Sequence, residues 1–271
     1  MAPKLGIIAG SGVLPRKLVE KCRETGRDCF VLAFHGETDP DGLDGVEQLW
    51  SRLGAAAKNF AALRQAGVEE LVMAGGLRRP SLAGLRPDWR TARFFARVGL
   101  GALGDNGLLS ALVKELEREG FTLVGVESVL IDVLAPEGVF GRHRPDDQAL
   151  ADIAQGFRVA AMLGSLDIGQ AVIVQQGMVL GVEAIEGTDQ LIARSGSLRR
   201  DGPGGVLVKA KKPDQERRTD LPTIGPQTVV ACHEAGLRGI AVEAGSTLVV
   251  ERGEVTALAD RLGLFVLGRP A

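Results

Sequence analysis

The fold is decided near the N-terminus, where residues 4–12 read Lys-Leu-Gly-Ile-Ile-Ala-Gly-Ser-Gly and residues 14–22 read Leu-Pro-Arg-Lys-Leu-Val-Glu-Lys-Cys. The first run is short, apolar and closed by glycines, which is typical of a buried strand. The second run has helical spacing and a proline in its first turn, where proline is tolerated. A strand, a glycine turn and a helix in succession predict the start of a parallel α/β sheet.

The same order of elements recurs through the first half of the chain. Further strands are predicted at residues 28–34, 70–74 and 122–126, and further helices at 53–65 and 108–119. Strands that alternate with helices favour a parallel sheet covered on both faces. We therefore predict an α/β protein whose N-terminal domain, residues 1–134, is Rossmann-like.

The pattern changes after residue 134. Residues 135–147 are polar and irregular and are predicted as a linker, in which Asp146 or Asp147 caps the following helix. Residues 148–271 are predicted as a mixed α/β catalytic domain whose topology the pattern does not give. Its strands are expected at 171–175, 179–185, 206–211, 240–243, 247–251 and 265–268, and its helices at 148–163, 227–235 and 255–262.

Composition narrows the class of protein. A chain of 271 residues has room for two domains, and a net charge of −2 gives no basic surface for nucleic acid. The three cysteines are scattered, so neither a disulfide framework nor a zinc site is indicated. No signal peptide and no apolar run near ~20 residues is found, which predicts a cytoplasmic protein. The oligomeric state is left open, and a homo-oligomer is among the alternatives.

Glycine turns at predicted strand ends are candidate anion sites. Gly10, Ser11 and Gly12 follow the first strand and precede a helix, and backbone amides at a helix N-terminus bind phosphate. Gly75 and Arg78 follow the strand at 70–74, and ligands of parallel sheets bind beyond the carboxyl ends of strands. The alternative for the turn at Gly10–Gly12 is a plain tight connection between strand and helix. The alternative for Arg78 is a charge at the rim of the protein surface with no ligand.

Residues 179–225 bring acids and cations together. Glu183, Glu186 and Asp189 lie at the end of one predicted strand and in the turn after it, where Thr188 is a candidate substrate contact. Lys209 and Lys211 are predicted to share one face of the strand at 206–211, so that both ammonium groups could meet one diphosphate. A solvated loop with surface ion pairs is the alternative for any one acid here.

Asp220 lies in the loop that follows, just before Pro222, which restricts the backbone. It is our candidate general base or metal ligand, and Glu183, Glu186 and Asp189 are candidate ligands beside it. One or two carboxylates completed by phosphate oxygens are what Mg²⁺ prefers.

Long stretches of this sequence resemble one family. They include GIIAGSGVLP, LGDNGLLSALVKELEREGF, LDIGQAVIVQQGMVLGVEAIEGTD and VLVKAKKPDQERRTDLPTIGPQTV. In this order they are similar to the LpxI-type UDP-2,3-diacylglucosamine pyrophosphatases, and the similarity covers nearly the whole chain. In that family the segment that matches Asp105 borders the nucleotide pocket, although Asp105 could equally be a helix N-cap.

The resemblance implies an enzyme of lipid A biosynthesis. It would hydrolyse the diphosphate of UDP-2,3-diacylglucosamine to UMP and 2,3-diacylglucosamine 1-phosphate, with Mg²⁺ as cofactor. The lipid-linked UDP-sugar would be met in peripheral contact with the inner membrane. Mg²⁺, Lys209 and Lys211 would stabilise the developing charge, and Asp220 would orient water or bind the metal.

Two alternatives belong to other classes. A non-catalytic regulator that binds a nucleotide sugar or lipid would need the glycine turns and not Asp220. A Rossmann oxidoreductase is disfavoured, because the glycine fingerprint is incomplete and the second strand ends in Ala33-Phe34-His35, with no acid for a ribose hydroxyl.

Overall fold

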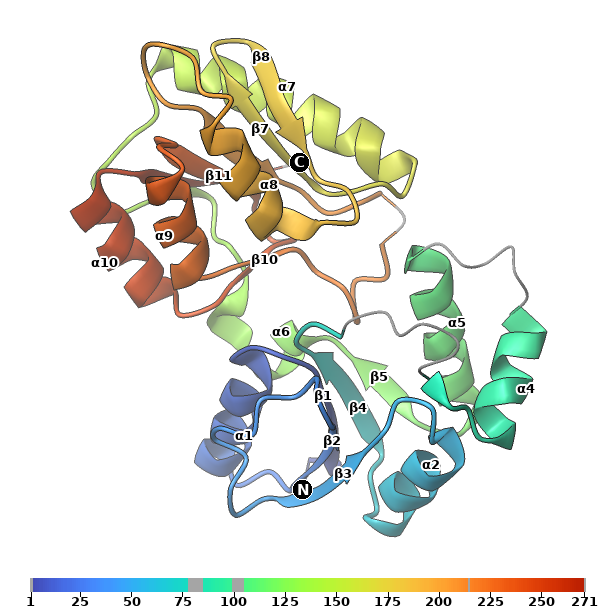
Figure 1. Ribbon diagram of the computed structural model, residues 1–271. Coiled ribbons are helices and arrows are strands. Elements are labelled where there is room, and N and C mark those ends of the chain that lie inside the picture. Colours follow the sequence, from blue (N-terminus) through green and yellow to red (C-terminus); the bar gives the residue numbers. More distant parts are fainter. Residues whose placement is uncertain (1, 78–84, 99–104, 214, 271) are drawn as a thin grey trace. The chain divides into compact units, whose positions relative to one another are not determined.

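The computed structural model describes residues 2–77, 85–98, 105–213 and 215–270, without the side chains of residues 105 and 106. The chain divides into two compact units (Figure 1). The first unit is Met1–Ile131 with Glu216–Thr219, and the second is Asp132–Gln215 with Asp220–Ala271. A short 3-10 helix, η2 (Ile131–Val133), lies where the first range gives way to the second.

The first unit is built on a parallel sheet whose strands lie in the order β3-β2-β1-β4-β5. The strands are β1 (Leu5–Ala9), β2 (Cys29–Phe34), β3 (Glu47–Ser51), β4 (Glu70–Ala74) and β5 (Thr122–Val124). The described helices of this unit are α1 (Leu14–Thr25), α2 (Ala56–Gln65), α4 (Trp89–Val98), α5 (Asp105–Arg118) and α6 (Val126–Val129). This confirms the predicted α/β class and its parallel N-terminal sheet.

The centre of this sheet is closed to water on both faces. Every residue of β1 is buried, and Ile7, Val31 and Val72 have no exposed surface. A strand buried on both faces reads as an unbroken apolar run, which is why β1 and β4 are found from sequence. The edge strand β3 is half polar, Glu-Gln-Leu-Trp-Ser, and the apolar pattern missed it.

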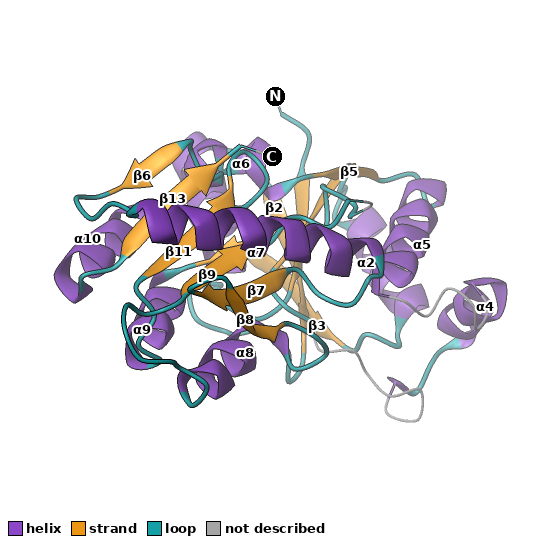
Figure 2. Cartoon of the chain, turned by 90° about the horizontal axis from the view of Figure 1, so that it is seen from above, coloured by secondary structure: helices purple, strands orange, loops and turns teal. Residues whose placement is uncertain are grey.

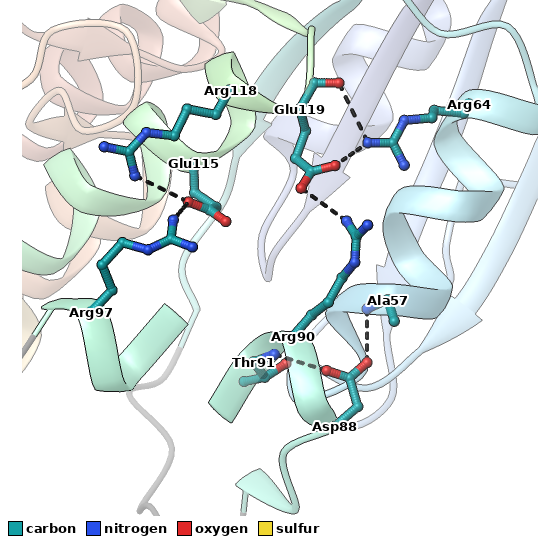
Figure 3. Close-up of polar contacts among 9 residues, drawn as sticks. All are labelled: Ala57, Arg64, Asp88, Arg90, Thr91, Arg97, Glu115, Arg118 and Glu119. Atoms are coloured by element: carbon teal, nitrogen blue, oxygen red, sulfur yellow. Dashed lines mark hydrogen bonds and ion pairs between the residues drawn. The ribbon is translucent and has the colours of Figure 1, made fainter. Parts of the chain in front are cut away.

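Three helices of the first unit are joined by charged side chains (Figure 3). Glu119 accepts hydrogen bonds from Arg64 on α2 and from Arg90 on α4, the second at 2.8 Å. Asp88 caps two helices at once, because its carboxylate accepts from the amide of Ala57 at 2.7 Å and from that of Thr91 at 2.8 Å. Both amides lie in the first turn of a helix, where backbone N–H groups have no acceptor within the helix.

The second unit has a six-stranded mixed sheet in the order β6-β13-β11-β9-β7-β8 and a two-stranded pair, β10-β12. Its strands are β6 (Gly138–Phe140), β7 (Ala171–Gln175), β8 (Met178–Val182), β9 (Val206–Lys209), β10 (Thr223–Ile224), β11 (Gly239–Glu243), β12 (Leu248–Val249) and β13 (Phe265–Arg269). Its helices are α7 (Asp147–Ser165), α8 (Gly187–Gly196), α9 (Pro226–Glu234) and α10 (Arg252–Leu262).

Helix α7 lies across one face of this sheet (Figure 2). Ala149 and Ile153 pack on β9, β11 and β13, and Ala160 packs on β7. Asp146 is the N-cap of this helix, since its carboxylate accepts from the amide of Ala149 at 2.8 Å. The larger apolar cluster of the unit includes buried side chains of α8, α9 and α10.

Several predicted boundaries in the second unit were wrong. The strand predicted to reach residue 185 ends at Val182, and the strand predicted to reach residue 211 ends at Lys209. Their shared partner β7 begins at Ala171, which pairs with Lys209, so the ladder on that side ends there. The predicted turn at 187–189 is the start of α8, and the strand predicted at 247–251 is only the two residues of β12.

The segment predicted as a linker contributes to the sheet. Strand β6 lies within residues 135–147 and pairs antiparallel with β13. Its three residues are too few for an apolar period to be seen in sequence. None of the helices described here has the combined length and apolar character that a bilayer crossing requires.

The double cap at Asp88 gives a stability prediction. Asp88→Ala should lower the free energy of unfolding by about 1–2 kcal/mol at pH 7, because two helix-terminal amides lose their acceptor. The measurement is urea denaturation followed by circular dichroism. Asp28→Asn, on an exposed residue of the same unit, is the control.

Asp88 should also make the free energy of unfolding depend on pH, and Asp88→Asn tests this dependence. Burial raises the pKa of Asp88, but the hydrogen bonds from Thr91 and Ala57 outweigh it and hold that pKa below its ordinary value. A lowered folded-state pKa stabilises the protein above the unfolded pKa, and this stabilisation is lost as pH falls through the folded value. The stability gap between wild type and Asp88→Asn should therefore shrink below about pH 4. A gap that is constant from pH 7 to pH 3 would contradict the assignment.

Candidate active site

A hydrogen-bonded chain of three side chains lies in the second unit, where strands β8 and β9 end. Glu183 follows β8, and its Oε1 accepts from the hydroxyl of Thr188 at 2.6 Å. The Thr188 hydroxyl oxygen accepts from the ammonium of Lys209, the last residue of β9, at 2.9 Å. Lys209 also donates to the carbonyl of Thr223 at 3.1 Å. This chain joins β8, α8, β9 and β10 through polar groups.

The Lys209 ammonium is a buried cation, with only 7% of the residue exposed. Burial lowers the pKa of Lys209, and the negative charges of Glu183, Asp189 and Asp220 act against that change. A buried charge is tolerated when opposite charge and hydrogen bonds surround it. Three of the acids expected at the site are thus gathered around one lysine.

Asp220 is half-buried and is held by a glutamine. Gln215 donates from Nε2 to the Asp220 carboxylate at 2.5 Å, and the same nitrogen lies 3.3 Å from Oε1 of Gln170. The amide of Gln170 donates to Glu183 at 3.0 Å. Gln170 and Gln215 therefore link the two carboxylates through a series of hydrogen bonds.

The two lysines expected to act together have no partner in common. The Lys211 ammonium donates to the carbonyls of Lys212 and Pro213, whereas Lys209 points to Thr188 and Thr223. The prediction of one shared strand face was wrong, because β9 ends at Lys209 and the alternation does not continue to Lys211. The Lys211 amide donates to Glu243 at 3.0 Å.

The acids predicted as metal ligands differ in how they are engaged. Both carboxylate oxygens of Glu183 accept hydrogen bonds, and Glu186 pairs with Arg194 at 2.7 Å. Asp189 is exposed in the first turn of α8. Across the described ranges, no group of three or more acidic, histidine or cysteine side chains is arranged to hold a metal ion.

Sequence reasoning missed several members of this network. Gln170, Gln215 and Thr223 hydrogen-bond to the acids and the lysine, and the buried Lys212 pairs with the half-buried Asp167 at 2.8 Å. Gln215 and Lys212 lie within residues 179–225, where the density of charged residues predicted a site, so the sequence carried a signal for them. Gln170 and Asp167 gave no signal, since only the sheet brings residues 167–170 near residues 212–220.

The glycine turns of the first unit close on each other. Gly10 follows β1, Gly75 follows the neighbouring β4, and Ser11 and Gly76 form an isolated β-bridge. The amide of Gly10 donates to the carbonyl of Ala74, and that of Ser11 donates to the carbonyl of Gly76.

The Gly12 amide also has a protein acceptor, the Asp39 carboxylate at 2.8 Å. All three amides expected to bind phosphate are therefore engaged within the protein. Arg78 lies outside the described residues, and so does the side chain of Asp105.

Both parts of the chain match models of one family. The model described as the LpxI N-terminal domain matches residues 4–133, and that described as the LpxI C-terminal domain matches residues 136–267. The chain belongs to the LpxI family. It is 42% identical over 272 residues to the UDP-2,3-diacylglucosamine pyrophosphatase LpxI of Caulobacter vibrioides, covering 98% of this chain and 97% of that protein.

Solved structures outside the family are only distantly similar. WbmG of Bordetella bronchiseptica in complex with NAD and UDP is 12% identical over the full length of both chains, with a TM-score of 0.35. The CobK precorrin-6A reductase is 13% identical, covering 100% of this chain and 89% of its own, with a TM-score of 0.33. Similarity this low carries no conclusion about ligands or chemistry.

The contact between the two glycine turns predicts different losses of stability for two alanine substitutions. Gly12 and Gly75 both have φ of +87°, so alanine is strained at either by about 1–2 kcal/mol. A Cβ at Gly12 meets no atom within 4 Å, whereas one at Gly75 would collide with the carbonyl oxygen of Ser11. Gly75→Ala should therefore destabilise the first unit by about 1–3 kcal/mol more than Gly12→Ala in urea denaturation. Equal losses would mean that the close approach is unimportant.

Proposed function

We propose that this chain hydrolyses the pyrophosphate bond of UDP-2,3-diacylglucosamine, the activity named for its Caulobacter relative. The products are UMP and 2,3-diacylglucosamine 1-phosphate, in a step of lipid A biosynthesis. The observation that carries this proposal is 42% identity over 98% of the chain, together with both family domains in order.

Asp220 is proposed as the residue that orients the attacking water and receives its proton. The water oxygen bonds to one phosphorus, the bond from that phosphorus to the bridging oxygen breaks, and the other phosphate leaves. A general base must be held in position for this proton transfer, and the hydrogen bond from Gln215 at 2.5 Å holds Asp220 in position. Its half-buried position favours a fixed carboxylate over one that moves freely in water.

Lys209 is proposed as a positioning residue. Its ammonium donates to the Thr188 hydroxyl and the Thr223 carbonyl, and the charges of Glu183, Asp189 and Asp220 act against the lowering of its pKa by burial. Lys211 and Thr188 are proposed to contact the substrate phosphates. Lys211 is half-buried, and among the described residues its ammonium donates to the backbone carbonyls of Lys212 and Pro213, which a phosphate can replace as acceptor.

Mg²⁺ is proposed as the cofactor. Glu183 and Glu186 fit poorly as its ligands because hydrogen bonds or an ion pair already engage them. Asp189 fits better because it is exposed, and Asp220 is proposed beside it because both carboxylates act on the charge of Lys209. Mg²⁺ needs only one or two carboxylates when phosphate oxygens complete its shell. When bound, it neutralises the charge of the diphosphate.

The substrate also implies where the enzyme works. A diacylated sugar nucleotide stays in a bilayer through its acyl chains, so we propose that the protein meets it in peripheral contact with the inner membrane, from the cytoplasmic side. Gly10 to Gly12, Gly75 and Arg78 stay proposed substrate contacts of the first unit because they follow the carboxyl ends of parallel strands, and Asp105 stays one by the family resemblance.

Asp220→Asn tests the chemistry. Asparagine keeps an oxygen for Gln215 but is no base, so kcat for UMP release should fall by about 10² or more while substrate binding persists. Asp201→Asn, on an exposed residue of the same unit, is the matched control and should retain wild-type kcat. A wild-type chain that binds the substrate without releasing UMP would instead be a non-catalytic regulator.

Metal removal tests the cofactor. EDTA should stop UMP release, and Mg²⁺ added in excess should restore it, since the described carboxylates need the ion to neutralise the diphosphate. The thermal midpoint without substrate should change little, because the proposed ion needs the oxygens of the diphosphate to complete its shell. Full turnover in metal-free protein, verified by elemental analysis, would contradict the proposal.

A further inference from the structure

Helix α4 of the first unit divides into an arginine side and an apolar side. Its sequence, Trp-Arg-Thr-Ala-Arg-Phe-Phe-Ala-Arg-Val, contains three aromatic residues, three arginines and no acidic residue. With 3.6 residues per turn, Thr91, Phe94 and Phe95 fall on the side away from the arginines. Thr91 is buried, and its hydroxyl donates to the carbonyl of Gly54 at 2.9 Å. The side that contains Thr91 therefore faces the protein, where α4 packs beside α2 and α5 (Figure 1).

The opposite side of α4 presents an indole and a cation to solvent. Trp89, Ala92, Arg93 and Ala96 are spaced i, i+3, i+4 and i+7, so they share one face, and all four are exposed, Trp89 to 63%. Arg93 has no hydrogen-bond or ion-pair partner among the residues that the structure describes. The guanidinium of Arg90 lies 5.2 Å from the centroid of the Trp89 ring and orients it. The two alanines are too small to cover either the ring or the cation.

The surroundings of this face carry an excess of positive charge (Figure 3). Two carboxylates are each shared by two guanidinium groups: Glu119 accepts from Arg64 and Arg90, and Glu115 accepts from Arg97 and Arg118. Four positive charges against two negative ones leave two positive charges, to which the exposed Arg93 adds a third. An exposed indole beside such an excess of arginines is complementary to a surface that is apolar inside and anionic outside.

We infer that α4 is a docking surface for a bilayer that contains anionic lipid. Trp89 enters the headgroup region, where an indole is favoured because one part of it is apolar and its N–H is polar. Arg93 meets the lipid phosphates, which attract arginines close to the surface. This inference rests on the proposed function for the reason that the protein visits a bilayer, since the proposed substrate is diacylated. The docking surface belongs wholly to the first unit.

The fluorescence of Trp89 reports its own contact with lipid. The chain has two tryptophans and no tyrosine, and the other tryptophan, Trp50, is half-buried on β3. In full-length Trp50→Phe, vesicles that contain phosphatidylglycerol should shift the emission of Trp89 to shorter wavelength, because its ring leaves water. In full-length Trp89→Phe, the same vesicles should leave the emission of Trp50 unchanged.

Sedimentation with the same vesicles measures the affinity. Trp89→Ala should weaken partition onto them roughly 10-fold, because the indole supplies the apolar area that enters the bilayer. Arg93→Glu should weaken it by roughly 5- to 30-fold, because an attraction to anionic lipid becomes a repulsion. Arg261→Glu, on an exposed residue of the second unit, changes the net charge equally and should partition as wild type does. Added salt should weaken the partition of wild type, and vesicles of phosphatidylcholine alone should bind it less.

Activity on two forms of the substrate gives a second measurement. With UDP-2,3-diacylglucosamine in phosphatidylglycerol vesicles, Trp89→Ala and Arg93→Glu should raise KM with little change in kcat, because fewer molecules reach the surface that holds the substrate. With the same substrate in micelles of a neutral detergent, both variants should match wild type. A loss of kcat in the micelles would place these residues in the chemistry and contradict a docking role.

The vesicle results separate this inference from the proposed function. Equal partition of Trp89→Ala, Arg93→Glu and Arg261→Glu overturns the inference even if wild type releases UMP. A change of oligomeric state in Trp89→Ala with unchanged partition also overturns it, because the face would then contact a second copy. Partition lost in Trp89→Ala and Arg93→Glu alone supports the inference even if wild type releases no UMP. Circular dichroism of each variant, and Trp89→Phe as the conservative change, show that lost partition is not lost folding.

Discussion

The second unit depends on one buried ammonium. Lys209 ends a central strand, has almost no contact with water, and is surrounded by the charges of Glu183, Asp189 and Asp220. Removing one member of such a set leaves charge uncompensated in a poorly solvated place, which is more costly than losing a surface pair. The hydrogen bonds to Thr188 and Thr223 tie the start of α8 and strand β10 to that strand end. The same cation that permits the acids to lie together also fixes the loops that carry them.

This arrangement explains why the acidic set holds no preformed metal cluster within the described ranges. A lysine already supplies positive charge among the carboxylates, and Glu183 is fully engaged by hydrogen bonds. A divalent ion that arrives with a diphosphate brings its own oxygen ligands, so Asp220 and Asp189 suffice in the proposed site. In the proposed site the ion is therefore shared with the diphosphate of the substrate.

The first unit depends on a different constraint, the close approach of two backbone segments to each other. The turns after β1 and β4 contact each other directly, and a Cβ at Gly10 would lie 2.5 Å from the carbonyl oxygen of Gly76. This contact uses the amides that an anion would otherwise need. Along the same sheet edge, the ends of β2 and β3 instead offer side chains, Trp50 and two cations, around a cavity.

The sequence by itself determined the parallel α/β sheet, because β1, β2 and β4 are buried on both faces and read as unbroken apolar runs. It also indicated the polar stretch that contains Lys209 and Asp220, because that density of charge is unsuited to a core. Only the tertiary structure decided that Lys209 and Lys211 have separate partners. The pairing of β9 with β7 ends at Lys209, and a strand's extent depends on its neighbours as well as on its own residues. Long-range pairing likewise placed Gln170 beside Gln215 and His35 beside Trp50. The sequence around each of these residues does not indicate which distant residue it contacts.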